Sequence, residues 1–259
     1  MKPNLNTLIT LAKGAGEILR AGYSQAKEIR HKGIVDLVTQ YDHQSENYLV
    51  GEIRRQFPHD PIVTEESGLL EGSGGGRWYI DPLDGTVNFA HGVPLFCVSL
   101  AYEEAGQMKF GVVYEPLRDE CYCAEAGRGA TLNQEPIHVS EAPDLIHSLL
   151  VTGFPHELLE TPNNNLDNFV NFSRRCQAVR RLGSAALDLC YVACGRLDGY
   201  WETRLSAWDV AAGGLIVREA GGTVTSLQGD PQIMLPPFSV LAANPTLHPL
   251  MLAVLQDKV

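Results

Sequence analysis

Apolar residues recur three and four positions apart at the start of the chain, with charged residues between them. One face of a predicted amphipathic helix is formed by Leu5, Leu8, Ile9, Ala12 and Leu19. A similar pattern begins near Asp42 and ends before Pro58, which predicts a second helix. Residues 34–39 and 62–64 are short, apolar and β-branched, and we expect a strand at each.

The middle of the chain changes to strand-like runs separated by turn residues. Runs at 96–102, 110–114 and 121–124 predict an antiparallel meander. The glycine-rich residues 72–76 are expected to form a flexible connector, because no phosphate-binding helix start follows them.

Helical and strand patterns alternate in the second half. Helices are predicted at 166–175, 185–194 and 247–255, and strands at 197–201, 223–227 and 238–242. The pattern is interrupted near residue 140, so we expect an N-terminal subdomain at 1–140 and a C-terminal subdomain at 141–259. Periodicity alone supports a mixed α and β fold.

Composition narrows the class of protein. The chain has 259 residues and 44% hydrophobic content, enough for one large domain or two closely packed subdomains. Its net charge of −11 argues against nucleic-acid binding through a basic surface. No run approaches a membrane span, the first helix is not a signal sequence, and the six cysteines show no C-x-x-C pair. We therefore expect a cytoplasmic protein with reduced cysteines and no nucleic-acid or membrane partner.

Residues 78–89 contain the most informative motif. An apolar run ends in Asp81 and Asp84, and Pro82 between them is expected to stop the strand and turn the chain sharply. The two carboxylates and the Leu83 carbonyl can then converge. Mg²⁺ prefers oxygen ligands and usually keeps water and substrate phosphate in its shell. The motif therefore predicts part of a magnesium site, although Asp-Pro and Asp-Gly pairs are also common in ordinary turns.

Gly85 and Thr86 follow this motif directly. A glycine lets a phosphate approach the backbone, and N–H groups at a helix start point toward an anion. A phosphate site next to the metal is the resulting prediction.

Two further acidic loci strengthen this interpretation. Glu65 and Glu66 follow the strand predicted at 62–64, so acids again lie at the carboxyl end of a strand. Asp209 lies in the first turn of a helical pattern that ends at Gly221 and Gly222. An acid at that position is also a favourable helix start, which is the structural alternative.

The three loci resemble, in residue type and order, the signature sequences of the inositol monophosphatase family of Mg²⁺-dependent, lithium-sensitive phosphatases. The resemblance covers most of the chain and includes 35–39 with Asp42, 64–68, 81–89, 183–186 and 208–209. Residues 64–68, 153–155 and 183–189 look most similar to the bacterial inositol-1-monophosphatase branch. The resemblance implies a layered α/β/α/β/α sandwich, of the type shared with fructose-1,6-bisphosphatases, with the site between two subdomains in a homodimer.

The resemblance also implies two to three Mg²⁺ ions and their ligands. The first ion would be held by Glu65, Asp81 and the Leu83 carbonyl, and the second by Asp81, Asp84 and Asp209. Asp81 would bridge the two ions, and Glu65 would help to hold a weaker third. Because clustered carboxylates repel one another, we expect metal to stabilise the fold.

Catalytic and substrate roles follow from the same resemblance. Thr86, oriented by Asp42, would position the attacking water together with Glu65, and the amides of Gly85 and Thr86 would bind phosphate. The substrate would also meet Asp84, Ser184, Ala185, Glu202 and Asp209, with Glu202 contacting a hydroxyl group. Lys32 lies near the family's loop lysine, although the sequence favours a solvated lysine there, and we assign no chemistry to His91, His138 or His156.

Three hypotheses therefore stand. The leading one is hydrolysis of inositol 1-phosphate or a close sugar-alcohol phosphate, which the sequence of residues 85–89 favours. The second keeps the chemistry but changes the substrate to histidinol phosphate, a nucleotide 3′-phosphate or fructose 1,6-bisphosphate. The third is a non-catalytic metal-binding interaction protein, against which the intact acidic positions argue.

Overall fold

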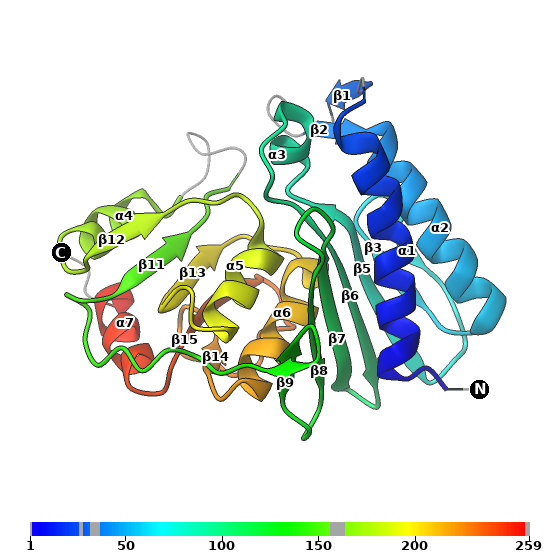
Figure 1. Cartoon of the computed structure of the whole chain (residues 1–259). Helices are drawn as coiled ribbons and strands as arrows, with labels where there is room; N and C mark the ends of the chain where they lie inside the picture. Colours follow the sequence, from blue (N-terminus) through cyan, green and yellow to red (C-terminus); the bar gives the residue numbers. More distant parts are fainter. Residues whose placement is uncertain (1, 26–27, 32–36, 156–163, 257–259) are drawn as a thin grey trace.

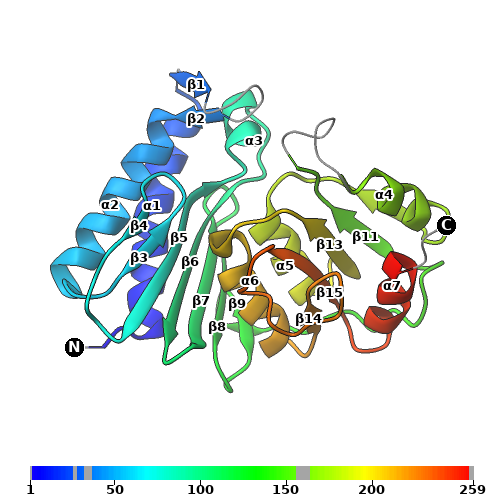
Figure 2. The same ribbon diagram turned by 180° about the vertical axis from the view of Figure 1, so that it is seen from behind.

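Five layers make up the computed structural model, which describes residues 2–25, 28–31, 37–155 and 164–256. Two helices cover one face of an eight-stranded sheet, two more lie between it and a five-stranded sheet, and two lie beyond the second sheet (Figure 1; Figure 2). The predicted α/β/α/β/α sandwich is confirmed.

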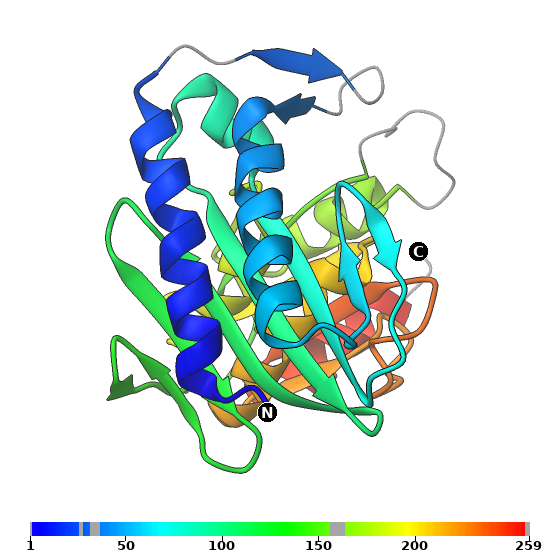
Figure 3. The ribbon, with the colours of Figure 1, turned by 90° about the vertical axis from the view of Figure 1, so that its right-hand side faces the viewer.

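The outer layer is formed by α1 (Leu5–Tyr23) and α2 (Gln40–Gln56), which lie side by side across the sheet in Figure 3. The side chain of Asn4 caps α1 by accepting a hydrogen bond from the Thr7 amide at 3.0 Å. Both helices bury the face that their apolar spacing predicted. Before α2, a small hairpin pairs β1 (Ile29–His31) with β2 (Leu37–Thr39), so the predicted strand is confirmed at 37–39, and residues 34–36 lie outside the described part of the chain.

The eight-stranded sheet has the order β10-β9-β8-β7-β6-β5-β3-β4. Its strands are β3 (Ile62–Thr64), β4 (Gly68–Leu70), β5 (Gly76–Asp84), β6 (Cys97–Glu104), β7 (Gln107–Glu115), β8 (Glu120–Glu125), β9 (Ala130–Leu132) and β10 (Glu135–Pro136). All pairs are antiparallel except β3 and β5, which run parallel. The predicted meander is therefore confirmed, with longer strands than expected.

One prediction about this sheet is wrong. Pro82 does not end its strand, because β5 continues to Asp84 and pairs again with β6 through Cys97. The register shifts between Asp81 and Asp84, so the missing proline N–H falls in an irregularity where the ladder does not require it. The two aspartates thus lie on one distorted strand, and the turn comes after them.

Helix α3 (Thr86–His91) follows that turn. Gly85 precedes it with φ of 93°, a left-handed conformation in which a Cβ would also lie 2.9 Å from the Leu95 carbonyl oxygen. The position therefore requires glycine.

Helices α5 (Ala185–Ala193) and α6 (Ala207–Glu219) form the middle layer. Both are apolar on nearly all sides, as expected for helices buried between two sheets. On β7, a Cβ added to Gly111 would lie 2.9 Å from the Ala212 carbonyl oxygen of α6. The close approach of sheet and helix thus depends on glycine.

The second sheet has the order β12-β11-β13-β15-β14. Its strands are β11 (Leu149–Thr152), β12 (Ala178–Arg180), β13 (Gly199–Thr203), β14 (Thr223–Thr225) and β15 (Ser239–Ala243), and its outer helices are α4 (Leu166–Ser173) and α7 (Leu247–Gln256). The sequence predicted β13, β14, β15 and the helices α4, α5 and α7 to within about two residues. It missed β11 and β12.

The proposed boundary at residue 140 falls between the two sheets, but one buried core cluster draws residues from both halves. The division into subdomains stays a prediction. Within the described ranges, no helix has both the length and the apolar content needed to cross a membrane.

Candidate active site

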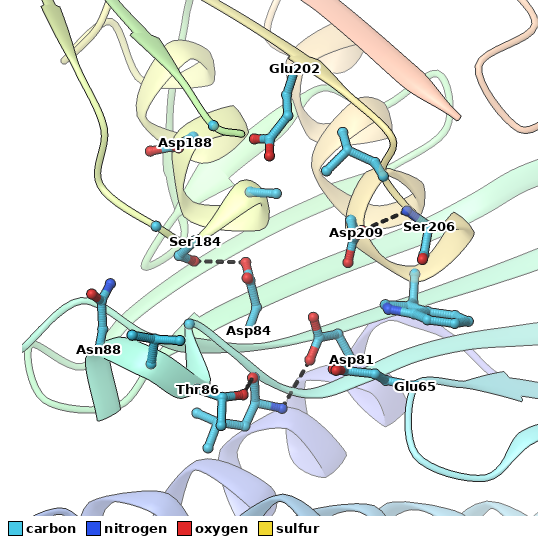
Figure 4. Close-up of a pocket in the computed structure, with 18 of the residues that line it drawn as sticks. Glu65, Asp81, Asp84, Thr86, Asn88, Ser184, Asp188, Glu202, Ser206 and Asp209 are labelled. Atoms are coloured by element: carbon cyan, nitrogen blue, oxygen red, sulfur yellow. Dashed lines mark hydrogen bonds between the residues drawn. The ribbon is translucent and has the colours of Figure 1, made fainter. Parts of the chain in front are cut away.

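A cavity of about 400 Å³ opens where the two halves meet. Its wall contains nearly every residue that the sequence assigned to the site: Glu65, Asp81, Leu83, Asp84, Gly85, Thr86, Ser184, Ala185, Glu202 and Asp209. Figure 4 shows Asp81 and Glu65 side by side on one wall, with Asp84 and Asp209 between them and Glu202. Residues far apart in the sequence are thus brought together as predicted.

The irregular end of β5 holds Asp81 in place. Its Oδ1 accepts a hydrogen bond from the Leu83 amide at 3.0 Å, and the side chain is only 2% exposed. Ser45 on α2 donates to the Pro82 carbonyl oxygen at 2.7 Å. The strand end is therefore anchored from both sides, which limits the motion of the Asp81 carboxylate.

Asp42 reaches the site through the start of α2. It is the third residue of the helix, and its Oδ2 accepts hydrogen bonds from the Thr39 amide at 2.8 Å and the Thr39 hydroxyl at 2.6 Å. Its Oδ1 accepts from the Thr86 hydroxyl at 2.9 Å, the contact that the sequence predicted. Burial raises the pKa of Asp42, and the hydrogen bonds from Thr39 and Thr86 act in the opposite direction.

Asp84 connects the first sheet to α5. Its Oδ2 accepts hydrogen bonds from the Ser184 hydroxyl and from the Ala186 amide, each at 2.7 Å. Ser184 is also the N-cap of α5. An anion at a helix N-terminus is stabilised by the unpaired amides and the helix dipole, so this carboxylate acts as part of the cap.

Asp209 has the structural role named as its alternative. It is the third residue of α6, and its Oδ2 accepts a hydrogen bond from the Ser206 amide at 2.6 Å in a capping box. The same side chain lines the cavity. Helix start and site residue are therefore compatible descriptions of one carboxylate.

Glu65 lies in a turn that is held by a residue we did not assign. Glu46 on α2 is 4% exposed and accepts hydrogen bonds from the Thr64 hydroxyl at 2.6 Å, the Glu66 amide at 3.0 Å and the Ser67 hydroxyl at 2.5 Å. These donors flank Glu65 on both sides. Glu46 follows Asp42 by four residues, so two acids on the buried face of α2 were the available sequence signal.

The carboxylates in the cavity repel one another. Burial raises the pKa of Asp81 most, and the charges of Glu65, Asp84 and Asp209 raise it further. The pKa of Asp209 is raised by burial and then by Asp84, while the hydrogen bond from Ser206 opposes the shift. A bound cation would offset this repulsion, and a set made only of oxygen donors fits a hard divalent ion.

The side chains do not, however, form a finished coordination sphere. In the described residues, no three His, Cys, Asp or Glu side chains have the geometry of a metal site. The Thr86 hydroxyl lies 2.9 Å from Asp42 Oδ1 and 3.0 Å from the Leu83 carbonyl oxygen, and its single hydrogen can be donated to only one of them at a time. Donation to Leu83 would compete with an ion for the same carbonyl oxygen. The ligand assignment therefore stays a prediction.

Glu202 lies at the end of β13 against a glycine. A Cβ on Gly153 would lie 2.1 Å from Glu202 Oε2, so the carboxylate occupies space that only glycine leaves open. The buried Tyr200 hydroxyl donates to Glu202 Oε2 at 2.5 Å. Burial raises the pKa of Glu202 to about 7; the charge of Asp84 adds to that shift, whereas Tyr200 and Arg181 oppose it.

Several residues of the wall were not predicted. Asp188, Arg181 and Arg204 also line the cavity. A single acid inside the apolar stretch of α5 was the only sequence signal for Asp188. Among the residues considered earlier, His91 and His138 do not line the cavity, and Lys32 and His156 lie outside the described part of the chain.

The model of the family described as "Inositol monophosphatase family" matches residues 1–259, the whole chain. The chain belongs to the inositol monophosphatase family. Membership makes it a metal-dependent phosphatase, and the predicted resemblance is confirmed.

Relatives in this family have two kinds of name. The chain is 43% identical to the inositol-1-monophosphatase of Mesorhizobium japonicum over 243 residues, 93% of this chain and 91% of the relative. It is 44% identical to the Nus factor SuhB of Pasteurella multocida over 232 residues, 88% of this chain and 87% of the relative. The solved structure of the extragenic suppressor protein suhB from Bartonella henselae superposes with a TM-score of 0.92 at 37% identity, and the match covers 98% of both chains. The fold and family are thus established, whereas the substrate is not.

Proposed function

We propose that this phosphatase uses Mg²⁺ to hydrolyse inositol 1-phosphate, or a close sugar-alcohol phosphate, to the alcohol and inorganic phosphate. The observation that carries the proposal is the meeting of Glu65, Asp81, Asp84 and Asp209 in one cavity beside the Thr86–Asp42 pair. The relative named inositol-1-monophosphatase supports the choice of substrate.

In the proposed reaction, a water oxygen attacks phosphorus and the bond from phosphorus to the alcohol oxygen breaks. The water loses a proton, and the departing alkoxide gains one. Bound Mg²⁺ would neutralise charge on the phosphate oxygens and lower the pKa of the attacking water. The residues assigned to hold it are Glu65, Asp81, Asp84, Asp209 and the Leu83 carbonyl, with two to three ions per site.

Thr86 and Asp42 are proposed to place the water. When the Thr86 hydroxyl donates its hydrogen to Asp42, its oxygen lone pairs are available to accept a hydrogen bond from water. Glu65 would accept the second hydrogen of the same water. This arrangement orients a water oxygen toward the phosphate without requiring any side chain to attack.

The remaining assigned residues would bind the substrate. The Gly85 and Thr86 amides are the proposed phosphate donors, and the glycine permits the close backbone approach that such contact needs. Glu202, held by Tyr200, would accept a hydrogen bond from a hydroxyl group of the alcohol. Ser184, Ala185 and the carboxylates of Asp84 and Asp209 would complete the wall around the leaving oxygen.

Other functions remain as alternatives to this proposal. Histidinol phosphate, nucleotide 3′-phosphates and fructose 1,6-bisphosphate would require the same chemistry with different contacts around Glu202. Some relatives are named as a Nus factor and not as a phosphatase. The preserved carboxylates support turnover over a purely non-catalytic role.

A phosphate-release panel tests the proposal. Inositol 1-phosphate, histidinol phosphate, adenosine 3′,5′-bisphosphate and fructose 1,6-bisphosphate are each supplied with and without Mg²⁺. We expect the highest kcat/KM for inositol 1-phosphate and no release without metal. Asp84→Asn should lower kcat by about 100-fold or more, because it removes charge from the reacting centre. Release by Asp84→Asn at the parent rate would contradict the metal assignment.

Three properties belong to the same proposal. We infer a homodimer, a cytoplasmic location and inhibition by lithium from the family resemblance. Sedimentation analysis and a lithium titration at fixed Mg²⁺ test the first and third directly.

A further inference from the structure

Asp188 is a buried carboxylate, and one of its two oxygens has no hydrogen-bond partner within the described part of the chain. It lies in the first turn of α5, and its side chain is 1% exposed. Its Oδ1 accepts no hydrogen bond within the described part of the chain. Buried carboxylates normally accept several hydrogen bonds, because removing a charge from water is costly. An exception of this kind calls for a ligand or another source of hydrogen-bond donors.

The position of Asp188 indicates which ligand that could be. It lines the same cavity as Glu202, and Figure 4 shows both at the end of the cavity away from Glu65 and Thr86. Burial raises the pKa of Asp188, the charges of Glu202 and Asp84 add to that shift, and Arg181 only partly opposes it. Two carboxyl groups therefore line the end of the cavity away from the proposed phosphate position.

Hydrogen-bond donors line the same cavity. Arg181 and Arg204 are exposed and line the cavity. Arg204 has φ of 57°, in the left-handed region that non-glycine residues rarely adopt. The cavity wall thus combines carboxyl groups, which accept hydrogen bonds, with arginine side chains, which donate them.

A ligand for such a wall must both donate and accept hydrogen bonds. Hydroxyl groups do both, because each has one hydrogen and two lone pairs. An aromatic or aliphatic leaving group without hydroxyls would leave Asp188 Oδ1 unpaired, whereas Glu202 would keep its hydrogen bond from Tyr200.

We propose that Asp188 and Glu202 together form a polyol subsite, in which each carboxylate accepts a hydrogen bond from a different hydroxyl group of the leaving alcohol. Asp188 is then the residue that selects alcohols with a second hydroxyl in reach. This inference rests on the proposed phosphatase function and adds a specificity-determining residue to it.

Asp188→Leu tests the subsite, because leucine has a similar size and cannot form a hydrogen bond. The measurement is the ratio of kcat/KM for inositol 1-phosphate to kcat/KM for p-nitrophenyl phosphate, whose leaving group carries no other hydroxyl. We expect the ratio to fall about tenfold, the effect of losing a hydrogen bond to a charged group. An unchanged ratio would overturn the proposal.

Thermal unfolding separates binding from a structural role. Replacing an uncompensated buried charge with an apolar side chain should raise the unfolding midpoint of the metal-free protein. A purely structural carboxylate would instead lower the midpoint and reduce activity toward both substrates equally, which would overturn the assignment. Asp144→Leu, which removes an exposed carboxylate outside the cavity, is the matched control and should leave the ratio within twofold.

Monodeoxy analogues of inositol 1-phosphate identify the hydroxyl. One analogue should react more slowly than inositol 1-phosphate with the parent protein but equally fast with Asp188→Leu. If every analogue keeps its penalty in the variant, Asp188 binds none of the hydroxyls and the proposal is wrong.

A binding measurement keeps the two proposals distinguishable. If no phosphomonoester is hydrolysed, the proposed function fails, but myo-inositol can still be tested with Mg²⁺ and phosphate present. A rise in the unfolding midpoint with myo-inositol that disappears in Asp188→Leu would support the subsite. A parent protein that shows no such rise and no selectivity for inositol 1-phosphate would overturn it.

Discussion

Some side chains in this molecule both cap a helix and contribute to the candidate active site. Asp42 and Asp209 are each the third residue of a helix and close a capping box, and each also contributes to the cavity or to a residue that lines it. The backbone contact fixes one carboxylate oxygen and leaves the other free for the site. The helix starts themselves therefore set the direction of these two carboxylates.

Glu46 should control the affinity for metal without touching it. In Glu46→Ala, the turn of residues 64–67 loses three hydrogen bonds, and Glu65 loses its fixed direction. We expect a fivefold to tenfold rise in the Mg²⁺ concentration for half-maximal activity. Substitutions of residues that orient metal ligands in other proteins lower metal affinity by a similar or larger factor. Isothermal titration with Mg²⁺ in the absence of substrate should show the same change.

Glu46→Gln is the matched variant for that prediction. Its amide oxygen can still accept some of the three donors, so its Mg²⁺ requirement should lie between those of the parent and Glu46→Ala. Equal Mg²⁺ requirements in all three proteins would show that Glu46 does not position Glu65.

Gly153 should be as important for substrate binding as Glu202 itself. In Gly153→Ala, the added methyl group occupies the place of the Glu202 carboxylate, which must rotate away. We expect KM for inositol 1-phosphate to rise about tenfold, with a smaller effect on p-nitrophenyl phosphate. Gly75→Ala, at a glycine with nothing within 4 Å of its Cβ position and without a positive φ, controls for general effects of such changes. A KM equal to that of the parent would contradict the predicted displacement of Glu202.

Among single residues, the sequence predicted those whose role is indicated by the residues next to them in the chain. Asp81, Asp84 and Glu65 lie at or near the carboxyl ends of apolar strands, so their clustering could be inferred from the sequence. Asp188, Glu46 and Gly153 could not be found in this way, because their importance lies in contacts with residues distant in the sequence. Nothing in the local pattern distinguishes them from ordinary helix or loop residues.

Elements of secondary structure position the site through a small number of direct junctions. Asp84 joins β5 to the start of α5, and Asp42 joins α2 to the start of α3 through Thr86. Asn88 on α3 donates to the Leu182 carbonyl oxygen at 2.8 Å, which links α3 to the segment before α5. The cavity is thus framed by helix starts that contact one another.

The sequence predicted elements whose pattern is long and missed those whose pattern is short. Helices α1, α2 and α6 have many turns of consistent spacing. The four-residue β11 has apolar neighbours but no alternation, because a strand at the centre of a sheet is buried on both faces. Pro82 misled the prediction of β5, since proline is tolerated at a strand irregularity that only the register reveals.

Two glycine substitutions test how closely the elements pack. Gly111→Ala should destabilise the protein by about 1–3 kcal/mol, because its methyl group would force β7 away from the α6 backbone. Gly51→Ala has open space around it inside α2 and should stabilise by up to about 1 kcal/mol through helix propensity. Urea unfolding of both variants measures these changes. Equal changes in the free energy of unfolding would show that the close packing of α6 against β7 does not require glycine at position 111.

For the whole molecule, the main consequence of this fold is electrostatic repulsion between buried carboxylates. Carboxylates from both halves are held in one buried cavity, and their repulsion opposes folding in the absence of a cation. The net charge of −11 adds to the same effect. Metal binding and overall stability are therefore expected to be coupled.

Mg²⁺ should raise the unfolding midpoint of the metal-free protein. At a concentration 100 times the dissociation constant, one bound ion contributes about 2.7 kcal/mol, which corresponds to a rise of roughly 5 °C or more for a chain of this size. Differential scanning calorimetry after chelation measures it. Asp209→Asn keeps an acceptor for the Ser206 amide but loses charge, so its midpoint should rise less with Mg²⁺. A parent midpoint that does not change with saturating Mg²⁺ would contradict the coupling.

The two sheets use separate stretches of sequence, yet α6 from the later stretch packs against β5, β6 and β7 of the earlier one. A chain cut at residue 140 would consequently yield two fragments, one with Glu65, Asp81 and Asp84 and the other with Glu202 and Asp209. Neither fragment would be active alone. Mixed together, they should reassociate through the face of α6 and recover phosphate release, so the enzyme should be suited to use as a split reporter of protein association.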